Sequence, residues 1–262
     1  MTRSRRVIVC LDVDDGRVVK GVQFRSLRQL GDPAEMAARY EQSGADEIVL
    51  LDISASATGR ETQWDTVRRT AERLFIPLTF GGGVRSVADV GHALRAGADK
   101  VAVNSAAVVR PAVISEASAW FGAQCIVASI DAKRDDCTQS GWRVFVHGGR
   151  TETELDAVAW ARECVDLGAG EILLTSIDRD GGRSGYDLEL THLVASLVSV
   201  PVVASGGAGS AQHVCAVLCE GGADAALVAG IVHDGVVSVE SIKAAMAGCG
   251  LAVRGDIVRG AA

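Results

Sequence analysis

The stretch AGADKVAVN at residues 96–104 returns half a chain later as GGADAALVA at residues 221–229. In both copies glycine precedes a short apolar run, which is typical of a helix end followed by a buried parallel strand. Glycine clusters recur in the same order, as GGG at 81–83 and SGGAG at 205–209. We therefore interpret the chain as one closed architecture built twice.

The rest of the chain continues this alternation of apolar and helical segments. Eight short segments rich in Val, Ile and Leu are typical of parallel strands covered on both faces. Eight strand–helix units predict an α/β fold, a single (β/α)8 TIM barrel of one domain, with half-barrels at about residues 1–122 and 123–262. The predicted strands are 7–13, 47–53, 77–80, 100–103, 125–131, 171–177, 201–205 and 225–229, and the predicted helices include 33–43, 62–74, 86–96, 111–121, 152–167, 210–220 and 239–247.

Composition and charge exclude several classes of function. A 48% hydrophobic content with 30 glycines suits a large core with many tight turns, and a net charge of −7 gives no general attraction to nucleic acid or an anionic membrane. Seven scattered cysteines without a CxxC pair predict no metal site and no disulfide framework. We expect no cofactor. We also expect a cytoplasmic protein, because the amino terminus lacks a cleavage signal and a long apolar run.

Two connections are longer than a barrel needs. Residues 14–31 are predicted as a long charged loop after the first strand, and residues 133–150 follow the fifth strand with a small hairpin at 141–149. Both leave the carboxyl ends of strands, where barrel active sites and their lids are built. Surface decoration is the alternative interpretation of both segments.

The glycine clusters predict anion binding. Each follows a strand and opens onto a helix, so backbone N–H groups can converge on a phosphate. Two such turns at equivalent places predict a substrate with a phosphate at each end. The residues of the two predicted cradles are Gly82, Gly83, Asn104 and Ser105 in the first half, and Ser205, Gly206, Gly207, Ala229 and Gly230 in the second.

Asp12 and Asp131 end the first and fifth predicted strands, between the two cradles. A carboxylate pair with no activated nucleophile nearby suits general acid–base catalysis, in which one group donates a proton and the other accepts one. The alternative is that each aspartate is structural and satisfied by backbone donors.

Several motifs, in order along nearly the whole chain, resemble one family. They are CLDV at 10–13, GRVVKG at 16–21, GGGV at 81–84, DAKR at 131–134, GAGEILLTSIDRDG at 168–181, SGYD at 184–187 and SGGAG at 205–209. This set is similar to the cyclase subunits of imidazole glycerol phosphate synthase, from histidine biosynthesis. The resemblance implies that ammonia is added to phosphoribulosyl-formimino aminoimidazole carboxamide ribonucleotide. The ring then closes, and imidazole glycerol phosphate and aminoimidazole carboxamide ribotide are released.

The resemblance also implies roles for single residues. Asp12 and Asp131 become the catalytic pair, Lys20 a substrate contact on a mobile first loop, and Thr175 and Asp178 substrate-binding residues. A glutaminase subunit is implied as the partner in a heterodimer, docked on the amino-terminal face and touching Asp99. Ammonia would enter the barrel through a gate formed by Arg6, Glu47, Lys100 and Glu171.

The chain departs from the family pattern at a few positions, and three alternatives stay open. Gly182 replaces a threonine, Gly230 a serine and Val232 an aromatic residue, while Val9 stands where proline is common. The alternatives are the isomerase of the same pathway, a barrel that delivers ammonia to another sugar, and a non-catalytic scaffold that activates a glutaminase. Lys20, the DAKR segment at 131–134 and the charged ring favour the cyclase over the isomerase. The intact strand end LDV at 11–13 argues against the barrel for another sugar, and the presence of both aspartates and both glycine clusters argues against the scaffold.

Overall fold

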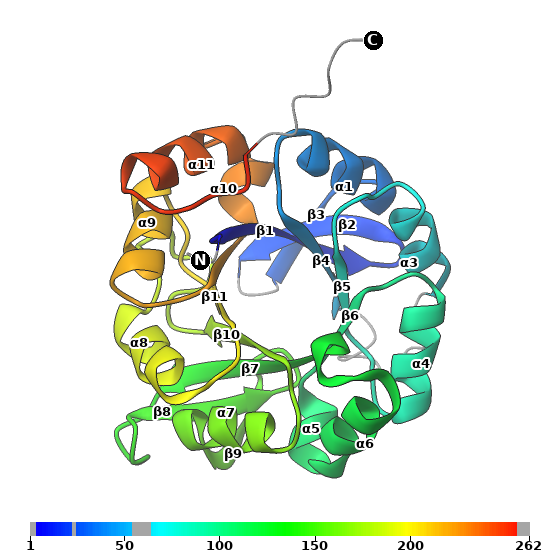
Figure 1. Ribbon diagram of the computed structural model, residues 1–262, viewed down its shortest axis with the longest axis vertical. Helices are drawn as coiled ribbons and strands as arrows, with labels where there is room; N and C mark the ends of the chain where they lie inside the picture. Colours follow the sequence, from blue (N-terminus) through cyan, green and yellow to red (C-terminus); the bar gives the residue numbers. More distant parts are fainter. Residues whose placement is uncertain (1–3, 23–24, 54–63, 256–262) are drawn as a thin grey trace.

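The computed structural model describes residues 4–22, 25–53 and 64–255. Eight parallel strands form a closed barrel, because β10 pairs with both β11 and β7 and so joins the two ends of the sheet path. Helices ring these strands (Figure 1). The predicted (β/α)8 barrel is confirmed. Its strands are β1 (Arg6–Asp14), β4 (Glu47–Asp52), β5 (Leu78–Gly81), β6 (Lys100–Val103), β7 (Ile126–Arg134), β10 (Glu171–Ser176), β11 (Val202–Ser205) and β12 (Ala225–Val228).

Six of the described helices begin at side-chain caps that the sequence encodes. Asp32, for example, accepts hydrogen bonds from the N–H groups of Ala34 and Glu35 and starts the first helix at Pro33. No helix in the described residues exceeds ten residues, and none could cross a membrane. The helices are α1 (Pro33–Gln42), α3 (Trp64–Ala71), α4 (Val87–Arg95), α5 (Ser105–Val109), α6 (Ala112–Phe121), α7 (Ala157–Asp166), α8 (Leu188–Leu197), α9 (Ala211–Cys219), α10 (Gly230–His233) and α11 (Val239–Gly248), with a 3-10 turn at Ala123–Cys125.

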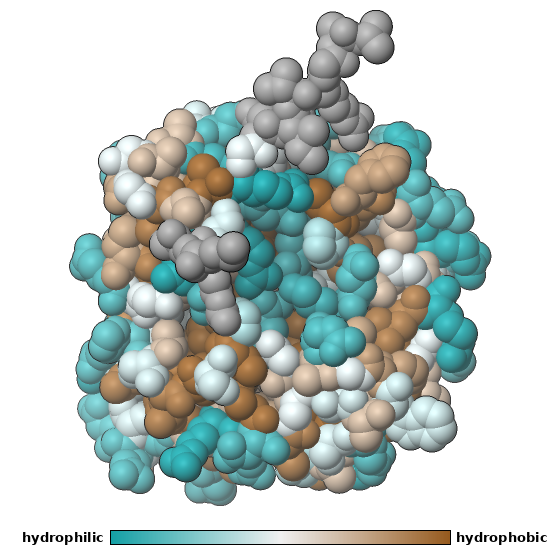
Figure 2. Space-filling model, in the orientation of Figure 1, coloured by the Kyte–Doolittle hydropathy of each residue, from teal (hydrophilic) through white to brown (hydrophobic). Residues whose placement is uncertain are grey.

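The strands separate two apolar cores. The larger lies between strands and helices, and a smaller one fills the barrel interior. Side chains alternate along a strand, so β1 sends Val7 and Val9 outward and Ile8 and Cys10 inward. The interior core contains Ile8, Cys10, Val49, Ala102, Val127, Leu173, Val203, Ala225 and Leu227. Seen from one end of the barrel, hydrophilic residues gather over its centre (Figure 2).

The first long connection is not a loop, so that prediction is wrong. Residues Arg17–Val22 (β2) and Arg25–Gly31 (β3) form an antiparallel hairpin that extends β1. The turn between β1 and β2 is Asp15-Gly16, with φ of 50° and 71°. An Asp-Gly pair with two positive φ values is the preferred two-residue hairpin turn, and it was the signal that the charged composition obscured.

The start of the helix predicted at 152–167 is also wrong. Thr151–Asp156 (β9) and Trp142–Val146 (β8) extend β7 as antiparallel strands, so 141–149 supplies a middle strand rather than a separate hairpin. Alternating threonines favour a strand in Thr151–Asp156. Asp156 then accepts from the N–H groups of Val158 and Ala159 and starts α7. Of the helix predicted at 62–74, residues 62 and 63 lie outside the described residues, and other elements shift by one to three residues at their ends.

Candidate active site

Two predicted catalytic acids lie at the carboxyl end of the barrel. Asp12 is near the end of β1, and Asp131 lies on β7. Thr175 on β10 is in register with Asp131 on one side and with Ser205 on the other. Three of the predicted site residues therefore stand side by side at the same level of the barrel mouth.

Asp131 is held by an amide. Asn104 Nδ2 donates to Asp131 Oδ2 at 3.0 Å. Burial raises the pKa of Asp131 to about 6, and this effect outweighs the hydrogen bond from Asn104, which lowers it. The other amide atom, Asn104 Oδ1, is buried without a hydrogen-bond partner among the described residues. A buried acceptor without a donor is costly, so this oxygen suits an N–H group of a bound molecule.

Asp12 has Cys10 as its neighbour instead of an amide, but its pKa is raised as that of Asp131 is. Burial, together with charge repulsion from Asp180, raises its pKa to about 6. Cys10 Sγ lies 3.5 Å from Asp12 Oδ1. Burial also holds the pKa of the Cys10 thiol well above its usual range, so the sulfur stays protonated and donates to Asp12. Both aspartates can exchange protons near neutral pH.

Asp180 is a third acid of the mouth that the sequence reasoning did not assign. Its charge raises the pKa of both Asp12 and Asp131, and burial raises its own pKa. The predicted residue in this segment was Asp178, whose carboxylate is exposed and accepts the backbone N–H of Arg134 at 2.7 Å. The only signal in the sequence was the spacing of these two acids, which does not say which one faces inward.

The two glycine turns have matching geometry. Gly82 has φ of 102°, and a Cβ there would come within 2.1 Å of the Asp52 carbonyl oxygen. Gly206 has φ of 88°, and a Cβ would come within 2.6 Å of the Ser176 carbonyl oxygen. In each turn only glycine fits, because the chain crosses the end of a preceding strand at van der Waals contact.

At α4 and α9, the helices after the glycine turns, side chains accept part of the backbone N–H groups. Ser86 caps α4 by accepting the N–H of Asp89, whose carboxylate in turn accepts the N–H groups of Arg85 and Ser86. Ser210 caps α9 by accepting the N–H of His213. In the described residues the short helices α5 and α10 start without a side-chain cap, at Asn104 and Ala229. Ser105 and Gly230, both predicted cradle residues, therefore stand at helix starts whose N–H groups no capping side chain accepts.

Lys20 lies on β2 of the hairpin, not on a loop. Its Nζ donates to the Gly230 carbonyl at 3.3 Å and forms an ion pair with Asp234. The hairpin therefore reaches the strand-end segment that carries one predicted cradle.

A ring of four charges closes the opposite end of the barrel. Arg6 pairs with Glu47 at 2.9 Å and with Glu171 at 2.5 Å, and Lys100 pairs with the same carboxylates at 2.8 and 2.7 Å. The two glutamates are only 2% and 8% exposed, and Thr79 donates to Glu47 at 2.5 Å. Two cations and two anions compensate each other in this buried place. The four residues predicted as a gate thus meet, while their transport role stays a prediction.

His233 is a second residue that the sequence reasoning left without a role. Its Nε2 lies 2.9 Å from the Cys10 carbonyl oxygen, and its Nδ1 lies 2.7 Å from the Tyr40 hydroxyl. Burial lowers the pKa of His233 to about 4, so the ring is neutral. Nε2–H then donates to Cys10, and Nδ1 accepts from Tyr40. This chain fixes β1 two residues before Asp12.

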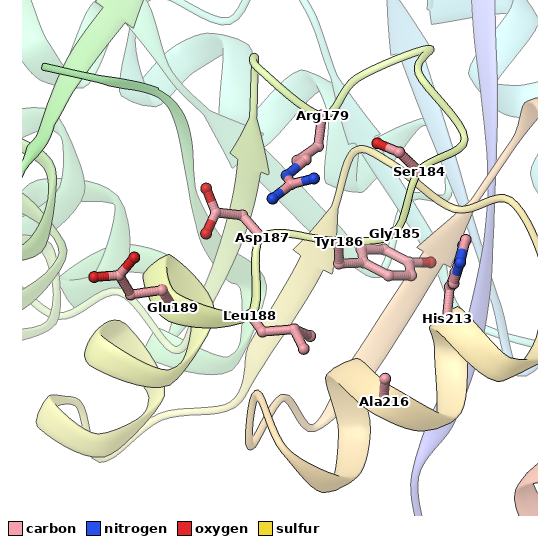
Figure 3. Close-up of a pocket in the computed structure, with 9 residues that line it drawn as sticks. All are labelled: Arg179, Ser184, Gly185, Tyr186, Asp187, Leu188, Glu189, His213 and Ala216. Carbon is pink, nitrogen blue, oxygen red and sulfur yellow. The ribbon is translucent and has the colours of Figure 1, made fainter.

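A cavity of about 420 Å³ lies beside the segment between β10 and α8 (Figure 3). The Arg179 guanidinium extends over it from that segment, and His213 reaches it from α9. Asp187 is already engaged, because it caps α8 and accepts from Trp142 Nε1 at 3.2 Å.

A closed eight-stranded barrel with three acidic side chains gathered at its carboxyl end belongs to a class of protein, the (β/α)8 barrels, whose active sites lie at that end. A family model described as histidine biosynthesis protein matches residues 6–238. The chain belongs to this family, and within it to the cyclase subunits of imidazole glycerol phosphate synthase.

The relatives that support this assignment cover almost the whole chain. Imidazole glycerol phosphate synthase subunit HisF of Myxococcus xanthus is 67% identical over 96% of this chain and 98% of its own. The subunit of the same name from Geobacillus thermodenitrificans is 57% identical over 96% and 99%. That of Metallosphaera sedula is likewise 57% identical over 96% and 99%.

Proposed function

We propose that this chain catalyses the ammonia-dependent cyclase reaction, converting phosphoribulosyl-formimino aminoimidazole carboxamide ribonucleotide into imidazole glycerol phosphate and aminoimidazole carboxamide ribotide. The observation that carries the proposal is the pair Asp12 and Asp131, both with a pKa of about 6 at the barrel mouth. Addition of ammonia, loss of water from the adduct and ring closure each need a proton given and a proton taken.

The raised pKa values suit both halves of this task. At pH 7 a carboxyl group with a pKa of about 6 is roughly nine-tenths ionised, so it can accept a proton, yet it regains one readily. Asp180 adds a third negative charge and favours a shared proton in the group. Asn104 supports the substrate through its unpaired Oδ1, which suits an N–H of the formimino-carboxamide part.

The substrate would lie across the mouth, with one phosphate at each cradle. Gly82, Gly83, Asn104 and Ser105 would bind one phosphate. Ser205, Gly206, Gly207, Ala229 and Gly230 would bind the other, near Lys20. Because the chain as a whole carries a net charge of −7, only such local donors and cations can hold a doubly charged anion.

Ammonia would enter at the other end of the barrel, from a glutaminase partner. The ring of Arg6, Glu47, Lys100 and Glu171 would be the gate, and the apolar interior core would lead from it to Cys10 below Asp12. A hollow of about 280 Å³ adjoins the ring and is lined by Arg6, Lys100 and Glu171 among others.

The amino-terminal face offers a docking surface for this partner. Phe75 follows α3 and is 86% exposed, and Trp120 is the penultimate residue of α6 and is 78% exposed. Both lie on segments that lead into barrel strands, as does exposed Asp99, whose carboxylate also accepts the N–H of Leu78 at 2.9 Å. Large exposed aromatic side chains are typical of protein interfaces.

The test is turnover by the purified chain alone, with ammonium salt at alkaline pH. Formation of imidazole glycerol phosphate is expected from the unaltered chain, with a loss of at least about a hundred-fold in Asp12→Asn and Asp131→Asn. No product from the unaltered chain, with substrate still bound, would reject the proposal. Full activity in either aspartate variant would reject the assigned acid–base pair.

A further inference from the structure

Asp234 is the meeting point of three positively charged side chains from separate segments. Its Oδ1 accepts from Arg28 of β3 at 3.0 Å. Its Oδ2 pairs with Lys20 of β2 and with Arg183 from the segment between β10 and α8. No other carboxylate in the described residues joins the hairpin to that segment.

The backbone carbonyl of Gly230 is a second acceptor for two of these three cations, Lys20 and Arg183. Its carbonyl oxygen lies 3.3 Å from Lys20 Nζ and 3.4 Å from Arg183 Nη2. A Cβ at Gly230 would touch both head groups, at 3.4 Å from Lys20 Nζ and 3.7 Å from Arg183 Nη2. Gly230 and Asp234 stand at the two ends of α10, so one short helix presents a carbonyl and a carboxylate to the same two cations.

This cluster differs from an ordinary surface ion pair. Exposed pairs contribute little, because water screens them and long side chains lose freedom when they are fixed. Here Lys20 and Asp234 are 20% and 24% exposed, and Lys20 and Arg183 each have two acceptors on α10. The cations also hold the pKa of Asp234 at about 2, well below its usual range, so the carboxylate stays charged.

Three cations share one carboxylate, so the cluster keeps a surplus of positive charge. It adjoins Gly230, the residue whose N–H belongs to the second phosphate cradle of the proposed function. A long lysine side chain that is already fixed loses less freedom when it contacts a ligand.

We propose that Asp234 is a positioning residue for the cyclase reaction: it fixes Lys20 and Arg183 against Gly230 at the second phosphate cradle before the substrate binds. This inference rests on the proposed function. It also has a structural consequence that does not depend on activity, because Asp234 ties the β2–β3 hairpin and the segment after β10 to α10.

The experiment compares Asp234→Asn and Asp234→Glu with the unaltered chain and with Asp166→Asn, a charge-matched control on α7 whose side chain is 71% exposed. Two measurements are made on the full chain. One is hydrogen exchange of the backbone amides in β2 and β3 without substrate, and the other is steady-state turnover with ammonium.

In Asp234→Asn we expect exchange in β2 and β3 to accelerate about five-fold or more, since a local contact that holds the hairpin is gone. The KM for the bis-phosphate should rise roughly five-fold while kcat changes less than about two-fold, as for a group that acts in binding. Asp234→Glu should recover most of both effects, because its carboxylate still reaches two flexible cations. Asp166→Asn should change neither.

Unchanged exchange in Asp234→Asn would overturn the structural role, and faster exchange with unchanged KM would overturn positioning for the reaction. A fall in kcat alone, with KM unchanged, would do the same. If the unaltered chain showed no turnover at all, the proposed function would fail, while the exchange measurement would still decide whether Asp234 holds the hairpin.

Discussion

Asp12 and Asp131 are carboxyl groups in a place that opposes their ionisation, and this predicts a pH-dependent cost to stability. A rise of the Asp12 pKa from 3.8 to about 6 corresponds to roughly 3 kcal/mol for a fully buried group. Because the side chain is only partly buried at the mouth, we expect about 1 to 2 kcal/mol. A folded-state pKa above the unfolded value means that stability is lost as pH rises from about 4 through 6.

Asp12→Asn should therefore stabilise the protein while it abolishes turnover. Denaturant unfolding should show a gain of about 1 to 2 kcal/mol at pH 7.5 and roughly a third of that at pH 4.5. The same gain at both pH values would mean that packing, not charge, is responsible, and would count against the raised pKa.

For His233 we expect the opposite dependence of stability on pH, over nearly the same pH range as for Asp12. Its folded-state pKa of about 4 lies below the ordinary 6.5, so its contribution to stability is lost as pH falls from 6.5 towards 4. His233→Gln cannot ionise, so the variant should lose less stability on acidification. The difference between the two proteins should change by roughly 1 to 2 kcal/mol between pH 7 and pH 5, measured by denaturant unfolding. Parallel pH profiles would contradict the neutral, buried ring.

The sequence predicted Asp12 and Asp131 because each ends an apolar run, a local pattern that the barrel topology turns into a shared site. Asp180, His233 and Asp234 were not predicted. Their roles depend on contacts across the fold, such as His233 with Cys10 and Asp234 with Lys20, which span more than 200 residues. No spacing along the chain encodes these contacts.

At the scale of elements, the glycine turns are the least tolerant parts of the mouth. Gly82→Ala should destabilise the protein by about 2 to 4 kcal/mol, because it adds both a disfavoured φ of 102° and a clash with the Asp52 carbonyl at 2.1 Å. Gly206→Ala should behave alike. Thermal unfolding measures the loss, and inorganic phosphate should protect both variants less than the unaltered chain.

The variant Gly235→Ala separates the cost of a positive φ from the cost of a steric clash. Gly235 has φ of 66° but nothing within 4 Å of an added Cβ, so only the backbone strain remains, about 1 kcal/mol. A loss in Gly235→Ala as large as that in Gly82→Ala would show that close approach of the chain is not what the glycine turns require.

Elements were predictable where one signal dominated. The barrel strands are apolar along most of their length, with charged residues near their ends, and Asp32-Pro33 starts α1 as expected. In Thr151–Asp156, charge suggested a helix while alternating threonines favoured a strand, and pairing with β8 decided between them. The β2–β3 hairpin likewise gains its stability from pairing with β1, for which the Asp15-Gly16 turn is a signal that the charged composition of the segment obscures.

At the scale of the whole molecule, we propose that the half-barrels at about residues 1–122 and 123–262 are structural repeats. Each adds two antiparallel strands to its first barrel strand, β2–β3 on β1 and β8–β9 on β7. Each also places a glycine over the end of a strand, Gly82 over Asp52 and Gly206 over Ser176. Superposition of the halves should align Asp12 with Asp131 and Gly82 with Gly206 in one register. A register that aligns one pair but not the other would refute the repeat.

The acids lie at one end of the barrel and the charged ring at the other. The proposed roles, proton transfer at one end and ammonia entry at the other, can therefore be tested separately. Lys100→Met leaves Glu47 and Glu171 with Arg6 as their only cation in the ring. Removing one partner from a buried group of charges costs about 3 kcal/mol, so unfolding should need less denaturant. If the ring is the gate, the ratio of glutamine-driven to ammonium-driven turnover with a glutaminase partner should fall several-fold.

A double variant separates stability from transport. Lys100→Met with Glu171→Gln removes one charge of each sign, so the ring stays neutral and most of the stability should return. The turnover ratio should stay low, because ammonia would still meet an altered ring. Recovery of the ratio together with stability would mean that these four charges serve only to hold the amino-terminal end of the barrel closed, and that ammonia does not depend on them to reach Asp12.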